Sequence, residues 1–203
     1  MLTLFHAPQS RSSRLVWLIE ELGAEVDIHY CDILRNDGSG ARDPLNPHPD
    51  GKVPALLHNG ALVTESGAVA LYLAGLYPEA GLGFAPGDPE RGVLLSWMFW
   101  ASGELEPALW SQITGTTATD PSARRRYEQA TDRLIEALWE GPWLMGDRFT
   151  VADVIIGSGM GWARPHLPDS PVFDRYLERL AERPARQRAQ ARDGDIAFLT
   201  RAA

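Results

Sequence analysis

The pattern of apolar and polar positions divides the chain into an early part with strand and helix signals and a later part with helix signals alone. Residues 2–6 form a short β-type run, and apolar residues between positions 15 and 22 repeat with a helical period that Gly23 ends. Residues 26–33 alternate between apolar and polar side chains, which is typical of a strand. These signals predict a strand, a helix and a second strand, the parallel start of an α/β unit.

The next segment, residues 35–50, is rich in glycine and proline and predicts a loop with room for a short helix. It leads to Val53 and Pro54, which open an apolar run. A proline cannot donate to a sheet ladder, so Pro54 is expected at the first position of a strand or in a turn, where its peptide bond can be cis. A cis bond there would leave the backbone groups of Val53 unpaired and able to capture a peptide-like ligand by strand addition.

A hairpin and a helix follow. Asn59 and Gly60 are a two-residue turn signal between apolar runs at 55–57 and 61–63, which predicts two antiparallel strands. The apolar run after residue 65 predicts a helix that begins near Ser66.

The start of this predicted helix contains groups that could bind a ligand carrying one positive and one negative charge. The amides of a helix N-terminus favour an anion, and the carboxylate of Glu65 favours a cation, so Glu65 and Ser66 together suit a zwitterion. The alternative is that the two residues only cap the helix.

The segment at residues 78–88 is rich in glycine and proline and predicts a linker, beyond which no strand is expected. One helix is predicted from Asp88 and Pro89 through Trp110, and a second over 121–139. A third is predicted after a capping box formed by Thr150 and Asp153. The last is predicted over 170–191, with an interruption at Pro184. The capping box is expected to serve the fold. The resulting division is a first domain at 1–77, a linker at 78–88 and a helical domain at 89–203.

Composition limits the classes of function. The chain has 203 residues, 44% of them apolar, and a net charge of −8, which argues against a nucleic acid or an anionic membrane as the main partner. One cysteine, Cys31, excludes an intramolecular disulfide and a CxxC redox pair. The five histidines lack metal-ligand spacing, so no metal is expected. Without a signal-peptide pattern or an apolar run of about 18 residues, we expect a cytoplasmic protein.

The GKVPAL turn at residues 51–56, the Glu-Ser pair at 65–66 and the order of predicted elements resemble the glutathione transferase family, in its bacterial, serine-type form with a theta-like active-site loop. The resemblance covers nearly the whole chain. It implies an α/β thioredoxin-like domain followed by an all-α domain, and a homodimer. It also implies a transferase that uses glutathione as co-substrate without a further cofactor, attacks small hydrophobic electrophiles and serves detoxification.

The resemblance also assigns residues. A hydroxyl between the first strand and the first helix would stabilise the glutathione thiolate, and Ser10, four residues before Arg14, fits the spacing of serine-type members. Ser12 is the alternative donor, and either serine could instead be the helix cap. Glutathione would be held by Lys52, Val53, Pro54, Glu65 and Ser66. The loop 46–51 is longer than usual for the family, which puts its contacts in question.

The second substrate has aromatic candidates in the predicted helical domain: Trp97, Trp100, Trp110 and Trp162. For each of them, packing in the core is the alternative. No tyrosine precedes Tyr30, which excludes a tyrosine-type site, and Cys31 is expected to be a buried inert thiol. The rival functions are a non-catalytic glutathione-transferase-like interaction module and a glutathione-dependent isomerase or reductase.

Overall fold

The computed structural model describes residues 1–194. By their contacts these residues form two compact units, Met1–Ala80 with the helix Pro184–Asp193, and Gly81–Arg183. The division falls between Ala80 and Gly81, inside the segment expected to be a linker. Residues 195–203, which the sequence assigned to the helical domain, lie outside the described residues.

The first unit is built on a four-stranded mixed sheet of order β2-β1-β3-β4. Its strands are β1 (Leu2–His6), β2 (Asp27–Tyr30), β3 (Ala55–His58) and β4 (Ala61–Thr64). The β1–β2 pair is parallel and the two other pairs are antiparallel, which confirms the predicted order of strands and the hairpin. Gly60 has φ +89°, a value that suits glycine in a hairpin turn.

Strand β2 is shorter than the alternating pattern over 26–33 predicts. After Tyr30 the carboxylate of Asp32 accepts hydrogen bonds from the backbone N–H of Ile33 at 2.8 Å and of Ala41 at 2.8 Å. These bonds turn the chain away from the sheet, so the alternation continues in a segment that no longer pairs as a strand.

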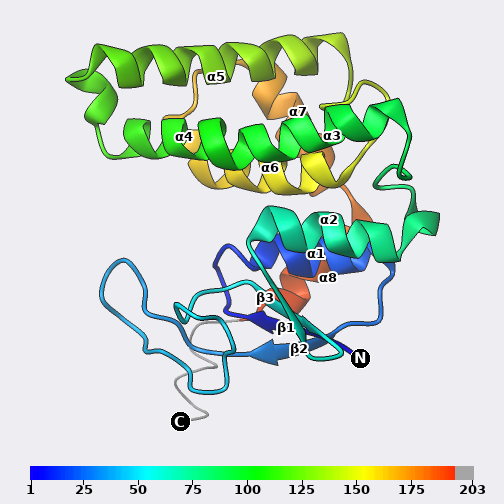
Figure 1. Ribbon diagram of the computed structural model, residues 1–203. Coiled ribbons are helices and arrows are strands. Elements are labelled where there is room, and N and C mark those ends of the chain that lie inside the picture. The colour runs from blue at the N-terminus through cyan, green and yellow to red at the C-terminus, as the bar shows by residue number, and fades with distance from the viewer. Residues whose placement is uncertain (195–203) are drawn as a thin grey trace. The chain divides into compact units, whose positions relative to one another are not determined.

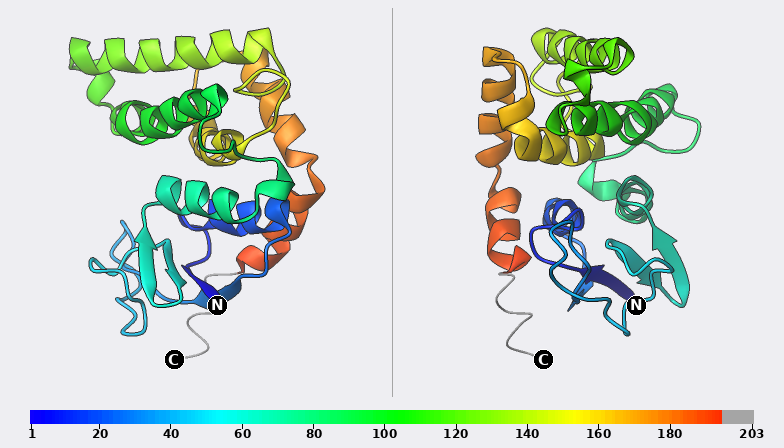
Figure 2. Two further views of the ribbon diagram at one scale, coloured as in Figure 1. Left: turned by 45° about the vertical axis from the view of Figure 1, so that its right-hand side comes forward. Right: turned by 90° about the vertical axis from the view of Figure 1, so that its left-hand side faces the viewer.

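The described loop between β2 and β3 contains turns and no helix, although the sequence left room for a short one (Figure 2). Two buried polar side chains organise its second half. Asn46 donates from Nδ2 to the carbonyl of Lys52 at 3.0 Å and accepts from the N–H of His48 at 3.1 Å. The His48 Nδ1 atom accepts from the N–H of Asp50 at 3.1 Å. The long connection is therefore an ordered turn that fixes the backbone directly before Val53.

Helices α1 (Ser13–Leu22) and α2 (Ser66–Leu76) lie on one face of this sheet, and α2 is followed by a short 3-10 turn, Pro78–Ala80 (Figure 1). Helix α1 ends as predicted at Gly23, whose φ of +60° is a left-handed value that glycine adopts without a side-chain clash.

Helix α8 (Pro184–Asp193) packs against α1 within the first unit, whereas the sequence assigned it to the helical domain. The carboxylate of Glu20 on α1 pairs with Arg188 at 2.8 Å and also with Arg192. Burial opposes the charge of Glu20, but the hydrogen bonds from the two arginines prevail and lower its pKa. Pro184 ends the preceding helix, which allows α8 to belong to a different unit.

The second unit is all helical in its regular structure. Its α-helices are α3 (Pro89–Trp100), α4 (Glu106–Ile113), α5 (Pro121–Glu140), α6 (Val151–Ala163) and α7 (Pro171–Ala181), with short 3-10 turns at Thr116–Ala118 and Arg164–His166. A π-helical segment, Ala101–Leu105, joins α3 to α4, so the single helix expected through Trp110 is one helical rod with a widened turn. Pro107 has no N–H for a normal helical bond, which accounts for the irregular turn just before it.

The predicted capping box opens α6. Asp153 is fully buried, and its Oδ2 atom accepts from the N–H of Thr150 at 2.9 Å. Its Oδ1 atom accepts from the N–H of Leu144 at 2.9 Å and from the hydroxyl of Tyr176 at 3.1 Å. Burial raises the pKa of Asp153 to about 6 although these hydrogen bonds act in the opposite direction. The box thus joins three segments of the second unit, which agrees with a role in the fold.

Candidate functional site

Ser10 lies in the loop between β1 and α1 and is half-buried. Its hydroxyl donates to the carbonyl of Ala7 at 2.7 Å, accepts from the N–H of Ser12 at 3.1 Å, and lies 2.8 Å from the hydroxyl of Ser12. The N-cap position of α1 is occupied by Ser12, whose side chain makes no capping hydrogen bond. Neither serine is therefore a side-chain cap of this helix, and the hydroxyl of Ser10 is held at the surface of the loop.

Ser12 differs from Ser10 in being fully buried, with an exposed fraction of 0%. Its hydroxyl lies 2.7 Å from Nδ1 of His6 and accepts from the N–H of Ala7 at 3.1 Å. The hydroxyl of Ser10 is a third neighbour of the Ser12 oxygen, which is therefore enclosed by polar groups of the protein. Of the two serines, Ser10 is the one that a ligand can reach.

Glu65 precedes α2 with φ +68° and ψ +123°, values that are rare for a residue with a side chain and cost on the order of 1 to 3 kcal/mol. The residue is exposed and its carboxylate makes no capping hydrogen bond to α2. No side-chain capping hydrogen bond therefore supports the interpretation of Glu65 as a simple helix cap. A strained, exposed carboxylate beside a helix start is instead a feature of binding sites.

Ser66 opens α2 and is buried, with an exposed fraction of 3%. Its hydroxyl accepts a hydrogen bond from Nη2 of Arg11 at 3.3 Å. The first backbone N–H groups of a helix have no partner inside the helix, so a hydroxyl, free amides and a guanidinium meet here. The sequence analysis missed Arg11, because no local spacing links the loop after β1 to the start of α2.

The peptide bond between Val53 and Pro54 is cis, as expected, and both residues are buried. The hydrogen bonds found among residues 1–194 include none from the backbone of Val53, and the pairing of β3 begins only at Ala55.

Lys52, in contrast to the buried Val53 and Pro54, has an exposed side chain. Its side chain is 73% exposed and pairs weakly with Asp50 at 3.8 Å.

The four candidate tryptophans, all in the second unit, divide by burial. Trp97 is buried, and Arg133 stacks on it and on Trp100 with its guanidinium carbon 4.5 Å from each ring centre. This pair serves packing between α3 and α5. Trp110 and Trp162 are 51% and 65% exposed, so their rings are open to a ligand.

Other chemistry has little support in the described part of the chain. Cys31 is buried, and burial raises its pKa to about 12, so the thiol is inert at neutral pH. Among residues 1–194 no three His, Cys, Asp or Glu side chains are grouped to hold a metal ion. None of the helices in that range combines the length and apolar character needed to cross a bilayer.

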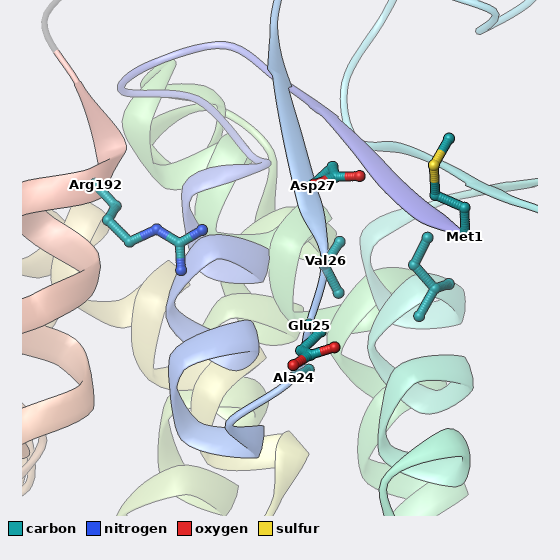
Figure 3. A pocket seen from close by; sticks show the side chains of 7 residues that line it. Met1, Ala24, Glu25, Val26, Asp27 and Arg192 are labelled. Carbon is teal, nitrogen blue, oxygen red and sulfur yellow. The ribbon is translucent and has the colours of Figure 1, made fainter.

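A hollow of about 530 Å³ lies elsewhere in the first unit, at the amino ends of β1 and β2 (Figure 3). Its lining includes Met1, the segment 24–27 and Arg192, and none of the predicted site residues. Ser10 follows the opposite, carboxyl end of β1. The hollow therefore belongs to another part of the first unit than the residues predicted to bind glutathione.

Comparisons with known proteins bear on this site. Residues 1–75 match the family model described as "Glutathione S-transferase, N-terminal domain". The chain is 27% identical over 197 residues to "Glutathione S-transferase GstA" of Escherichia coli O157:H7, covering 94% of this chain and 98% of the relative. It is 30% identical over 203 residues to "Disulfide-bond oxidoreductase YfcG" of Escherichia coli K12, covering 91% of this chain and 92% of the relative.

The chain is also similar to solved structures of glutathione transferases. A glutathione transferase from Methylococcus capsulatus has a TM-score of 0.78 and 32% identity, covering 96% of this chain and 99% of the other. A sphingomonad glutathione S-transferase complexed with glutathione also has a TM-score of 0.78, with 28% identity over 95% of this chain and 98% of the other.

Proposed function

Because the chain belongs to the glutathione S-transferase family, we propose that it binds glutathione on its first unit and transfers the glutathionyl group to small hydrophobic electrophiles. The observation that carries this proposal is the exposed carboxylate of Glu65, held in a rare backbone conformation next to the buried Ser66 and making no capping bond.

The γ-glutamyl end of glutathione is a zwitterion, and the start of α2 complements both of its charges. Glu65 pairs with the ammonium group. The hydroxyl of Ser66 and the free amides of α2 bind the carboxylate, with the guanidinium of Arg11 beside them.

The cysteinyl part of glutathione is peptide-like, and the backbone of Val53 is suited to bind it. Its groups are without a partner among the described hydrogen bonds, and the Asn46 turn holds the chain that leads to them. Pro54 shapes this turn. Lys52, whose ammonium group is on a side chain that is 73% exposed, is proposed for the carboxylate of the glycyl end.

Ser10 is proposed to stabilise the thiolate. A free thiol titrates near 8.5, and each unit of lowering needs about 1.4 kcal/mol of preference for the charged form. A hydrogen bond to a charged group contributes about 1.5 to 3 kcal/mol and a helix N-terminus about 0.3 to 1 kcal/mol, together enough for one to two units. The thiol proton passes to solvent, and the sulfur then forms a bond to the electrophilic carbon as the leaving group departs. Ser10 keeps its own proton throughout, and its accessibility favours it over Ser12.

The remaining proposals concern the partners and setting. Trp110 and Trp162 are the exposed candidates to contact the electrophile, whereas Trp97 and Trp100 are engaged with Arg133. We further propose a homodimer that works in the cytoplasm in detoxification.

A second candidate function is the glutathione-dependent reduction of disulfides, which the 30% identity to a disulfide-bond oxidoreductase favours. With Cys31 buried, the protein has no reactive thiol in its described part. The sulfur chemistry then belongs to glutathione itself: one thiolate attacks the disulfide and releases a thiol, and a second glutathione completes the reduction and forms glutathione disulfide.

Titration calorimetry with glutathione, followed by turnover assays, tests the proposal. We expect binding, and conjugation of a chlorodinitrobenzene-type electrophile. Faster turnover of a small disulfide than of any electrophile in a panel would favour the second candidate. Absence of glutathione binding would contradict both and leave a non-catalytic interaction module.

A further inference from the structure

Arg11 follows Ser10 in the loop between β1 and α1, and its side chain joins this loop to the start of α2. Its Nη2 atom donates to the hydroxyl of Ser66 at 3.3 Å. The proposed function places the sulfur of glutathione at Ser10 and the γ-glutamyl end at Ser66. A ligand bound in this way extends along the Arg11 side chain, from its backbone next to Ser10 to its guanidinium next to Ser66.

The hydroxyl of Ser10 has a single proton to offer to the sulfur. In the structure this hydroxyl donates to the carbonyl of Ala7 at 2.7 Å, so donation to a thiolate exchanges one hydrogen bond for another. A guanidinium is charged at every pH of interest, and a charge acts over a distance. Arg11 can therefore stabilise a thiolate without giving up its contact with Ser66.

The other charges assigned to this part of the site oppose a thiolate. Glu65 is an anion, and the γ-glutamyl end of the ligand brings one cation and one anion. Without Arg11, the occupied site would be net negative even before the thiol ionises. With Arg11, these charges balance. Because a like charge disfavours the ionised thiol and an opposite charge favours it, the guanidinium should lower the pKa of bound glutathione.

Other charged groups approach the loop between β1 and α1 from its remaining neighbours. Arg35, from the loop between β2 and β3, donates from Nη2 to a backbone carbonyl of this loop at 3.0 Å. The carboxylate of Asp193, at the end of α8, accepts from a backbone N–H of the same loop at 3.0 Å. These two groups have opposite charges, so their effects on the loop largely cancel. Arg14, in the first turn of α1, is half-buried.

We propose that the guanidinium of Arg11 stabilises the glutathione thiolate by its positive charge, in addition to facing the γ-glutamyl carboxylate. The thiol proton passes to solvent, and Arg11 keeps its own protons throughout. This inference rests on the proposed function. It applies to conjugation and to disulfide reduction alike, since both begin with the thiolate.

The test measures the pKa of bound glutathione from the ultraviolet absorbance of its thiolate, in the unmodified protein and in two variants of Arg11. Arg11→Gln keeps an N–H donor but removes the charge, so the thiolate pKa should rise by about half a unit to one unit, as expected for one charge roughly 6 to 8 Å away in polar surroundings. Arg11→Lys keeps the charge and should retain most of the effect. Both variants should fold, because the Arg11 side chain is exposed.

Two controls separate the charge effect from other roles. Arg35→Gln removes a cation whose charge Asp193 balances, and it should shift the thiolate pKa by less than Arg11→Gln does. S-methylglutathione has the same γ-glutamyl end but no ionisable thiol. Its loss of affinity for Arg11→Gln therefore measures the contact with the carboxylate alone.

The outcomes distinguish this inference from the proposed function. If the unmodified protein does not bind glutathione, the proposed function fails. If it binds glutathione and Arg11→Gln leaves the thiolate pKa unchanged, the role of Arg11 at the sulfur fails alone, even where affinity for S-methylglutathione falls. An equal shift in Arg35→Gln or in Arg11→Lys would also overturn it, because the effect would then not depend on a charge at position 11. Should Arg11→Gln bind too weakly to be saturated, the pH dependence of its glutathione dissociation constant gives the same pKa by linkage.

Discussion

The guanidinium nitrogen Nη2 of Arg11 lies 3.3 Å from the hydroxyl oxygen of Ser66, although 55 residues separate the two in the sequence. The contact joins the loop after β1 to the first residue of α2, and Glu65 is the residue directly before it in the chain. Cationic, anionic and hydrogen-bonding groups thus meet at one helix start, which is what recognition of a zwitterion requires. The proposed glutathione site is built around this contact.

Glu65→Ala should weaken glutathione binding about ten- to hundredfold, because a hydrogen-bonded ion pair to the ligand ammonium is worth about 1.5 to 3 kcal/mol. The melting temperature should change little, since the carboxylate is exposed and makes no capping hydrogen bond to α2. Calorimetry and thermal unfolding on the same variant check this, with the exposed Glu79 of the 3-10 turn, changed to Ala, as the control. A large loss of melting temperature with unchanged affinity would mean that Glu65 only serves the helix.

Glu65→Gly separates binding from stability more sharply. Glycine adopts a φ of +68° without the cost that a side chain incurs, so the folded protein should be as stable as the parent or slightly more stable. Glutathione affinity should fall as in Glu65→Ala. Urea unfolding measures the first effect. A clear loss of stability would show that the backbone at position 65 is not strained.

Asp153 should make stability depend on pH in the second unit. Its folded pKa of about 6 lies above the value of about 3.9 for an unfolded Asp, so the folded state binds an extra proton between these values. The stability from this group is therefore present below about pH 4 and lost as pH rises through 6, at about 1.4 kcal/mol per unit and on the order of 2 to 3 kcal/mol in all.

Comparison with Asp153→Asn isolates this effect, because Glu20 and the other carboxyl groups titrate alike in both proteins. The stability advantage of the unmodified protein over the variant should grow as pH falls from 7 to 4.5, measured by urea unfolding. A constant difference across that range would mean that the carboxyl is not perturbed.

The oligomeric state gives a fourth test. We expect a homodimer, so sedimentation at micromolar concentration should give about twice the chain mass of 22.4 kDa. A single species of 22.4 kDa would exclude the dimer under those conditions.

Local patterns predicted most of the fold. The Asn59-Gly60 turn, the end of α1 at Gly23 and the start of α2 at Ser66 each depend on residues adjacent in sequence, and each is found where expected. The π-helical turn at Ala101–Leu105 was missed because the apolar pattern continues through it.

Local sequence patterns do not predict contacts between segments that are distant in the chain. His6 and Asp193 are 187 residues apart, and no spacing rule brings a C-terminal helix back to the end of the first strand. For the same reason the sequence placed α8 in the helical domain. Local sequence chemistry indicated Val53, Glu65 and Ser66, and the family resemblance selected Ser10, whereas Arg11 required the structure.

The central claim is that the hydroxyl of Ser10 stabilises the glutathione thiolate, and the pKa of glutathione bound to Ser10→Ala tests it most directly. That pKa should rise by about one to two units with little change in binding, so turnover at pH 7 should fall roughly ten- to hundredfold and recover in part toward pH 9. Ser12→Ala, the matched control, should shift the pKa less, because Ser12 acts only through Ser10. A full shift in Ser12→Ala with none in Ser10→Ala would make Ser12 the donor, and no shift in either variant would contradict the hydroxyl mechanism.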